Sequence, residues 1–172
     1  MNRRNPSVPD NVRADENNYA FIDSQNLNLA ILDQGWKLDF VRFRKYLSDK
    51  YGITKAILFM GHISKYEPMY KRLRSAGFEI VFKPIVEREG EVKGNVDAEL
   101  VLHAAAVEFA HYDKALIVTG DGDFRCLIEY LKQHKKLLKL MVPNSYKYSS
   151  LLRKFIKDIV FMNNLRQKLS AH

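Results

Sequence analysis

Three aspartates stand directly after segments that have the composition of buried strands. Asp121 and Asp123 follow the apolar, β-branched residues 115–119 in ALIVTGDGDF, and Asp23 follows a second apolar run, residues 19–22. In open α/β sheets, ligands bind just beyond the carboxyl ends of the strands. Carboxylates that converge repel one another unless a cation joins them, and oxygen ligands suit Mg²⁺ or Mn²⁺. We therefore predict a divalent-cation site at this edge of a sheet.

A fourth aspartate, Asp97, falls in the first turn of a helix predicted over residues 96–110. The helix is nearly continuous in apolar residues, which predicts that it is buried. Its amino end faces the predicted metal site only if the chain crosses over at that point. The same helix carries His103, and a helical histidine more often packs than binds a ligand.

Each of these polar residues also has a purely structural interpretation. Asp23, Ser24 or Asn26 suits the cap of the helix that begins LNLAIL. Gly-Asp-Gly-Asp is a favourable turn sequence by itself, and Asp97 interacts favourably with a helix dipole. Capping explains one such residue, but it does not explain why two strands distant in sequence both end in acids. The combination favours the metal site.

The rest of the chain alternates strands with helices, which predicts an α/β fold: a central parallel sheet with helices on both faces. Further strands are predicted at 55–60, 78–82, 137–142 and 159–162. Further helices are predicted at 38–51, 67–76, 123–134, near 150–155 and at the C-terminus. Residues 87–95 alternate charge with glycine and are predicted to form an exposed loop, and residues 1–17 a disordered tail. Residues 18–172 then form one domain with a basic C-terminal portion.

Composition narrows the class of protein. At 172 residues and 47% hydrophobic, the chain is predicted to be one soluble globular domain. No apolar run approaches the roughly 20 residues of a membrane helix, and Arg3 and Arg4 precede no apolar segment of a secretory signal. The single cysteine, Cys126, excludes an intramolecular disulfide and is predicted to be a buried hydrophobe. We expect a cytoplasmic protein without a membrane partner.

The net charge of +8 is concentrated near the C-terminus. Ten of the 28 Lys and Arg residues lie after residue 130, where Asp158 is the one acid. A basic surface beside an acidic pocket suits a polyanion such as RNA, although basic surfaces also serve solubility. An exposed or, alternatively, a packed loop follows the strand at 137–142. The residues predicted to contact phosphates and bases are Lys93, Tyr146, Lys147, Tyr148 and Arg153.

Three segments together resemble the NYN domains of the LabA-like group, within the PIN-like nuclease class. They are FIDSQN at 21–26, KGNVDAEL at 93–100 and TGDGDF at 119–124. The resemblance covers roughly residues 18–165 and implies a PIN-like, Rossmann-like fold and metal-dependent ribonuclease activity. It implies metal-site roles for Asp23, Asp97, Asp121 and Asp123, with Asn26, Thr119 and His103 lining the site.

The chain departs from the family pattern at three positions. Ser24 and Thr119 replace residues that are often glycine and serine, and His103 stands where many members carry a further acid. We therefore carry two hypotheses: an Mg²⁺- or Mn²⁺-dependent ribonuclease that favours single-stranded RNA, and a catalytically weak RNA-binding or scaffold module, which His103 favours. A homodimer is left open. A haloacid dehalogenase-type phosphatase is excluded because Gln25 replaces its second acid, and no P-loop motif is present.

Overall fold

The computed structural model describes residues 15–84, 86–88, 91–93 and 96–172, with 86–88 and 91–93 described in their backbone alone. The tail predicted at residues 1–17 lies outside the described residues as far as residue 14. Within it, Asn17 donates hydrogen bonds from its backbone to Asp113 Oδ2 (2.7 Å) and from its side chain to the His111 carbonyl (2.8 Å). No helix in the described ranges is long and apolar enough to cross a membrane.

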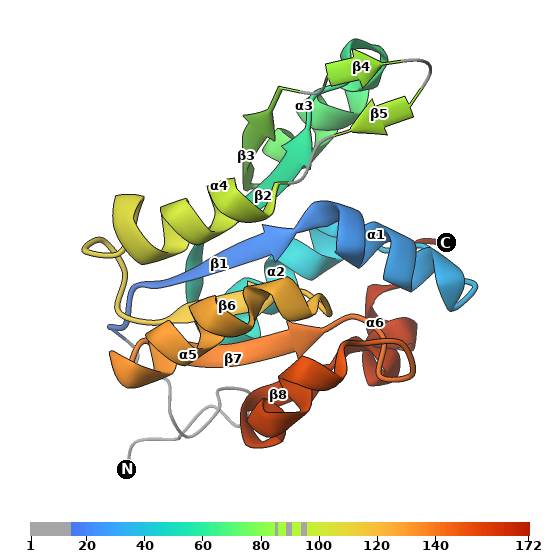
Figure 1. Cartoon of the computed structure of the whole chain (residues 1–172). Helices are drawn as coiled ribbons and strands as arrows, with labels where there is room; N and C mark the ends of the chain where they lie inside the picture. The colour runs from blue at the N-terminus through green and yellow to red at the C-terminus, as the bar shows by residue number, and fades with distance from the viewer. Residues whose placement is uncertain (1–14, 85, 89–90, 94–95) are drawn as a thin grey trace.

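A six-stranded parallel sheet forms the centre of the molecule (Figure 1). In spatial order its strands are β3 (Phe78–Lys83), β2 (Ile53–Gly61), β1 (Asn18–Asp23), β6 (Ala115–Val118), β7 (Leu137–Val142) and β8 (Ile159–Phe161). The chain adds strands outward from β1 in one direction and then, starting with β6, in the other. The order therefore reverses between β1 and β6. The predicted fold class is confirmed.

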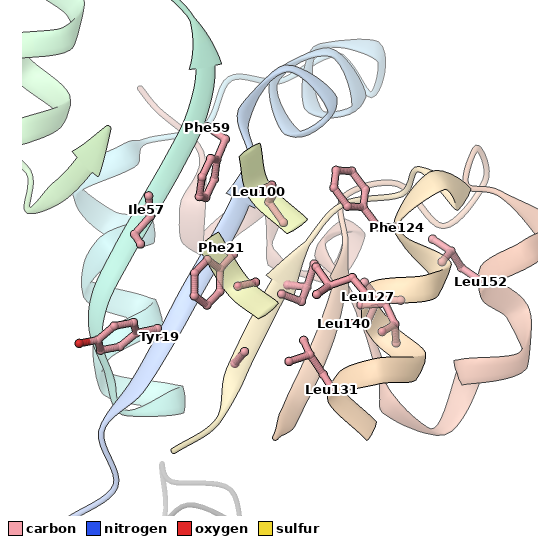
Figure 2. Close-up of a cluster of buried hydrophobic side chains, with 14 of the residues drawn as sticks. Tyr19, Phe21, Ile57, Phe59, Leu100, Phe124, Leu127, Leu131, Leu140 and Leu152 are labelled. Atoms are coloured by element: carbon pink, nitrogen blue, oxygen red, sulfur yellow. The ribbon is translucent and has the colours of Figure 1, made fainter. Parts of the chain in front are cut away.

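Helices cover both faces of this sheet because its strands are apolar on both. Phe21 and its alternate neighbours pack under α4 (Asp97–Leu102) and α5 (Arg125–Gln133), as Figure 2 shows. Ile22 and the residues in phase with it pack on the opposite face. The helices on that face are α1 (Ser24–Asp33), α2 (Phe40–Tyr51), α3 (Glu67–Ser75) and α6 (Arg166–Leu169).

Short helical turns connect these elements. They are the 3₁₀ turns η1 (Ser64–Tyr66), η3 (Gly122–Phe124), η4 (Ser150–Asp158) and η5 (Met162–Leu165), and the π-helical η2 (His103–Val107). Between β3 and α4, β4 (Val86–Arg88) and β5 (Glu91–Lys93) pair in an antiparallel hairpin. The prediction of an exposed loop at 87–95 is wrong to that extent, because the charged residues and the glycine of this segment also suit two short strands joined by a tight turn.

Two burial predictions are wrong. The helix predicted as buried at 96–110 covers the sheet with one face only, so Leu100 and Ala104 are buried while Leu102 and Val107 are about half exposed (56% and 49%). Cys126 is exposed. It lies outside the buried stripe of α5, which Leu127, Ile128 and Leu131 form, because a helix on a sheet buries a single stripe of residues.

Candidate metal centre

The predicted site lies where the strand order reverses. Asp23 is the last residue of β1, and Asp121 lies in the turn that follows β6. The two strands pair in parallel with Ile22 opposite Val118, so both chains leave the sheet at the same edge. In doubly wound sheets, ligands bind in the crevice at this reversal point.

Asp97 reaches the same place from the first turn of α4. Asp23, Asp97 and Asp121 each contribute a carboxylate oxygen, and these three oxygens lie within 4.8 Å of one another. Asp23 is buried, with 4% of its surface exposed, and the other two are partly buried. Two oxygens held by one cation at about 2.0–2.6 Å each are separated by no more than about 5 Å, so the spacing suits a single ion.

One buried hydroxyl fixes two of these acids. Thr119 is fully buried, and its hydroxyl donates a hydrogen bond to Asp23 Oδ2 at 3.1 Å. The same hydroxyl oxygen accepts a hydrogen bond from the backbone N–H of Asp121, also at 3.1 Å. Thr119 therefore couples the end of β1 to the turn after β6.

Asn26 makes a second connection between the two turns. Its backbone N–H donates to Asp23 Oδ1 (3.2 Å), so Asp23 caps α1, as the helix-capping interpretation of the sequence predicted. Its side-chain oxygen accepts from the N–H of Gly120 at 2.8 Å. Capping and metal binding are compatible, because a carboxylate oxygen with two lone pairs can serve both.

Burial makes ionised Asp23 unfavourable without a cation. It raises the pKa of Asp23 from its ordinary value of 3.8 to about 6. The hydrogen bonds from Asn26 and Thr119 lower the pKa but do not compensate, and the negative charges of Asp97 and Asp121 raise it further. A nearby positive charge would favour the ionised form. Three converging carboxylates of this kind fit Mg²⁺ or Mn²⁺.

Asp123, the fourth predicted ligand, lies outside this three-carboxylate group. It is exposed, and its backbone N–H donates to Asp121 Oδ1 at 2.9 Å. The turn between them is tight because Gly122 lies against Ser149, where a Cβ at residue 122 would be 2.3 Å from Ser149 Oγ. The two acids on this turn point in different directions, so Asp121 lines the pocket and Asp123 faces solvent.

His103 packs beside the site. Its ring lies edge-on to Phe59, with the ring centroids 5.3 Å apart. Its Nδ1 is buried and has no hydrogen-bond partner among the described residues. It is not among the residues that line the carboxylate pocket.

The loop predicted to contact RNA has three different environments. Tyr146 is 87% exposed. Lys147 is exposed, and its ammonium group lies 2.8 Å from the carboxylate of Asp33. Tyr148 is partly buried, with its ring 5.5 Å from that of Phe161. The prediction of a packed loop is therefore correct for Tyr148, and the prediction of an exposed loop is correct for Tyr146 and Lys147.

The remaining residues predicted to contact RNA belong to two different elements. Arg153 is exposed on η4. Lys93 belongs to β5, and its side chain lies outside the described part of the chain. Some of the basic charge near the C-terminus is neutralised by ion pairs, namely Lys132–Asp158, Lys147–Asp33 and Lys154–Glu129.

Three pocket residues were not predicted. The carboxylate pocket has a volume of about 240 Å³, and its lining includes Gln25, Leu29 and Val96 beside the acids and Asn26. Gln25 and Leu29 are four residues apart on α1, which places them on one helix face beginning two residues after Asp23. That spacing could have predicted Gln25 and Leu29 as pocket residues from the sequence. No sequence pattern predicts Val96, because its position depends on how α4 packs.

Comparison with known proteins places the chain in a family. A family model of the NYN domain matches residues 19–161. The chain is also similar to the crystal structure of a protein of unknown function from Vibrio parahaemolyticus, with a TM-score of 0.72, 24% identity, and coverage of 93% of this chain and 100% of that one. At this identity the likeness shows the fold alone. Comparison with curated proteins gave no match.

Proposed function

The chain belongs to the NYN domain family, and from this premise we propose that it is a metal-dependent ribonuclease that hydrolyses phosphodiester bonds of RNA. The observation that carries the proposal is the group of three carboxylates at the reversal point of the sheet. The fold is of the nuclease type that the family is known for, and the acids are compatible with its chemistry. Membership in the LabA-like group is part of the same proposal.

In this proposal Asp23, Asp97 and Asp121 hold Mg²⁺ or Mn²⁺. When bound, the ion would supply activation of a water molecule and stabilisation of the leaving oxygen, so no side-chain nucleophile would be needed. Thr119 and Asn26 act as positioning residues, because each donates to a different oxygen of Asp23. The low exposure of Asp23 keeps bulk water away from one side of the site.

Single-stranded RNA is the proposed substrate. The backbone N–H of Ser149 donates to the Gly120 carbonyl at 3.0 Å, so the segment that carries Tyr146, Lys147 and Arg153 is attached to the turn that carries Asp121. The exposed basic side chains of this segment suit phosphate contacts, and the exposed tyrosine suits base stacking.

A second candidate, a catalytically weak RNA-binding module, is favoured by one observation. His103 occupies the position at which many members of the family carry a further acid, and its ring packs on Phe59. If that acid is required, the remaining three carboxylates bind metal without efficient cleavage.

The decisive experiment is incubation of labelled single-stranded RNA with purified protein in Mn²⁺ or in EDTA. We expect cleavage in Mn²⁺ by the wild type and by Asp49→Asn, whose aspartate is exposed on α2 in an ion pair with Lys45. We expect none in EDTA and none by Asp121→Asn, which lacks a charged ligand. RNA that the wild type binds but does not cut would establish the binding module.

Asp123→Asn tests how many acids the site uses. Because Asp123 is exposed and outside the three-carboxylate group, we expect this variant to retain Mn²⁺-dependent cleavage. Loss of cleavage equal to that of Asp121→Asn would restore the four-acid site implied by the family resemblance.

A further inference from the structure

A second pocket opens directly beside the carboxylate pocket. It has a volume of about 360 Å³ and lies between α1, the end of β2, η1 and α3. Gln25 and Val96 line both pockets, so the two are contiguous. The volume falls within the roughly 300–1,000 Å³ of small-molecule sites.

We propose that this second pocket, the base pocket, binds one base of the RNA strand whose neighbouring phosphate lies at the carboxylates. The inference rests on the proposed function and extends it, because it assigns a residue-level site for substrate recognition. Three features of the lining select a nucleobase as the occupant.

The first feature is the absence of formal charge from the described lining residues. A phosphate group is bound most strongly where Arg or Lys neutralises its charge, whereas a neutral base needs no such charge. The charged part of the strand then lies over the adjacent carboxylate pocket and its ion, and the base lies in the uncharged pocket.

The second feature is an aromatic and thioether surface. Tyr66 is 41% exposed at the mouth of the pocket, and Phe40, Met60 and Met69 are partly buried within it. Every base has a π face that stacks on an aromatic ring, and thioether sulfur also contacts ring systems favourably.

The third feature is a pair of amides at the rim. Gln25 and Asn28 are exposed on the first turns of α1 and both line the pocket. Each amide offers donors and an acceptor, as does the hydrogen-bonding edge of a base. The lining therefore presents a stacking surface with polar groups along one side.

The wall of the base pocket is held in place before any ligand arrives. Tyr70 is buried, its hydroxyl accepts from the N–H of Ile63 at 3.0 Å, and the same hydroxyl donates to the Gly61 carbonyl at 3.4 Å. These bonds fix the turn that leads to Tyr66. The ammonium group of Lys65 lies over the Tyr66 ring, 5.0 Å from the ring centroid.

The test measures binding in EDTA, so that it does not depend on cleavage. Short labelled single-stranded RNAs are titrated against wild type, Tyr66→Ala and Tyr66→Phe, with an abasic nucleotide placed at each position in turn. Removing a stacking ring is expected to weaken binding about 5- to 100-fold, and Tyr66→Phe, which keeps the ring, is expected to bind as wild type does.

The abasic series makes the assignment specific. At one position, an abasic nucleotide should weaken binding to the wild-type protein as much as the Tyr66→Ala substitution weakens binding of intact RNA. The same abasic nucleotide should not weaken binding to the Tyr66→Ala variant any further. A 4-thiouridine at that position should crosslink to residues 61–70. Two results would overturn the base pocket. One is that Tyr66→Ala binds intact RNA with the affinity of wild type. The other is that Tyr66→Ala lowers the affinity for intact RNA and for abasic RNA by the same factor.

The outcomes separate the two proposals. Cleavage in Mn²⁺ with no effect of Tyr66→Ala overturns the base pocket and leaves the ribonuclease. Coupling between Tyr66 and one base without cleavage by the wild type overturns the ribonuclease and leaves the base pocket. Failure to bind RNA in any condition overturns both.

Discussion

Asp23→Asn is expected to stabilise the metal-free protein at neutral pH, although Asp23 lies at the centre of the proposed site. The folded protein holds the pKa of Asp23 at about 6, against an ordinary value of 3.8. The difference is about two pKa units, and at 1.36 kcal/mol per unit, ionised Asp23 destabilises the fold by about 3 kcal/mol. Asparagine loses one hydrogen-bond acceptor, which costs about 1 kcal/mol, so the expected net gain is about 2 kcal/mol.

The sign of the pH dependence follows from linkage. Because the pKa is higher in the folded state, the folded protein keeps a proton on Asp23 between about pH 4 and 6 that the unfolded chain has released. The free energy of unfolding therefore falls as pH rises through this window, and the full loss is in place above it. Asp23→Asn has no such loss, so the difference between wild type and variant should open between about pH 4 and 6 and then stay constant.

The assay is urea unfolding in EDTA, followed by the fluorescence of Trp36, the single and buried tryptophan. Subtracting the variant from the wild type at each pH cancels the titrating groups that do not interact with Asp23. Asp49→Asn, an exposed aspartate in an ion pair, is the control and should follow the wild-type curve. A difference that does not change with pH, or a variant less stable than wild type at neutral pH, would refute the reasoning.

Mn²⁺ should reverse the order of the two proteins. An ion that binds only the folded state adds about 2.7 kcal/mol of stability at a concentration 100 times its Kd. Wild type should gain this stability if the ion joins Asp23, Asp97 and Asp121 as proposed. Asp23→Asn, with one charged ligand fewer, should gain much less. Equal gains would show that the ion binds elsewhere.

Three other variants test the surroundings of the site. Gly122→Ala places a Cβ 2.3 Å from Ser149 Oγ, so we expect a loss of roughly 1–3 kcal/mol in urea unfolding, partly relieved by adding Ser149→Gly; an unchanged midpoint would contradict the close approach. Arg153→Glu should weaken RNA binding and lower the salt slope of log K by about 0.7 for each phosphate that is no longer neutralised, whereas Lys45→Glu on α2 should leave the slope unchanged; equal effects would assign the basic charge to solubility. His103→Asp should raise Mn²⁺-dependent cleavage if the site is a weakened nuclease, and wild type and variant both inert on RNA would favour the binding module.

The strands were predictable because each is a short apolar run ended by polar residues or glycine. The predicted strand at 137–142 coincides with β7, and the one at 115–119 exceeds β6 by a single residue. Burial on both faces makes these runs continuous rather than alternating, which is the pattern of a parallel sheet. The local composition is therefore sufficient to predict most strands of the sheet.

The surfaces of the helices were less predictable. Cys126 lies in an apolar stretch, yet it is exposed, because the stripe of α5 that meets the sheet is set by Leu127, Ile128 and Leu131. Leu102 and Val107 are exposed on the helical segment α4–η2 for the same reason. Hydrophobicity alone does not tell which apolar residues of a helix face the sheet when more of them are present than one stripe can hold.

The four acids differ in how far sequence reasoning could place them. Asp23 and Asp121 must share an edge in any parallel sheet that pairs β1 with β6. A helix that precedes a parallel strand runs antiparallel to it, so its amino end also lies at the carboxyl edge; this accounts for Asp97, the first residue of α4. What the topology leaves open is the strand over which α4 packs, and it packs on β1, beside Asp23. Asp123 could not be placed this way, because its direction is set by the turn at Gly122 and not by the sheet.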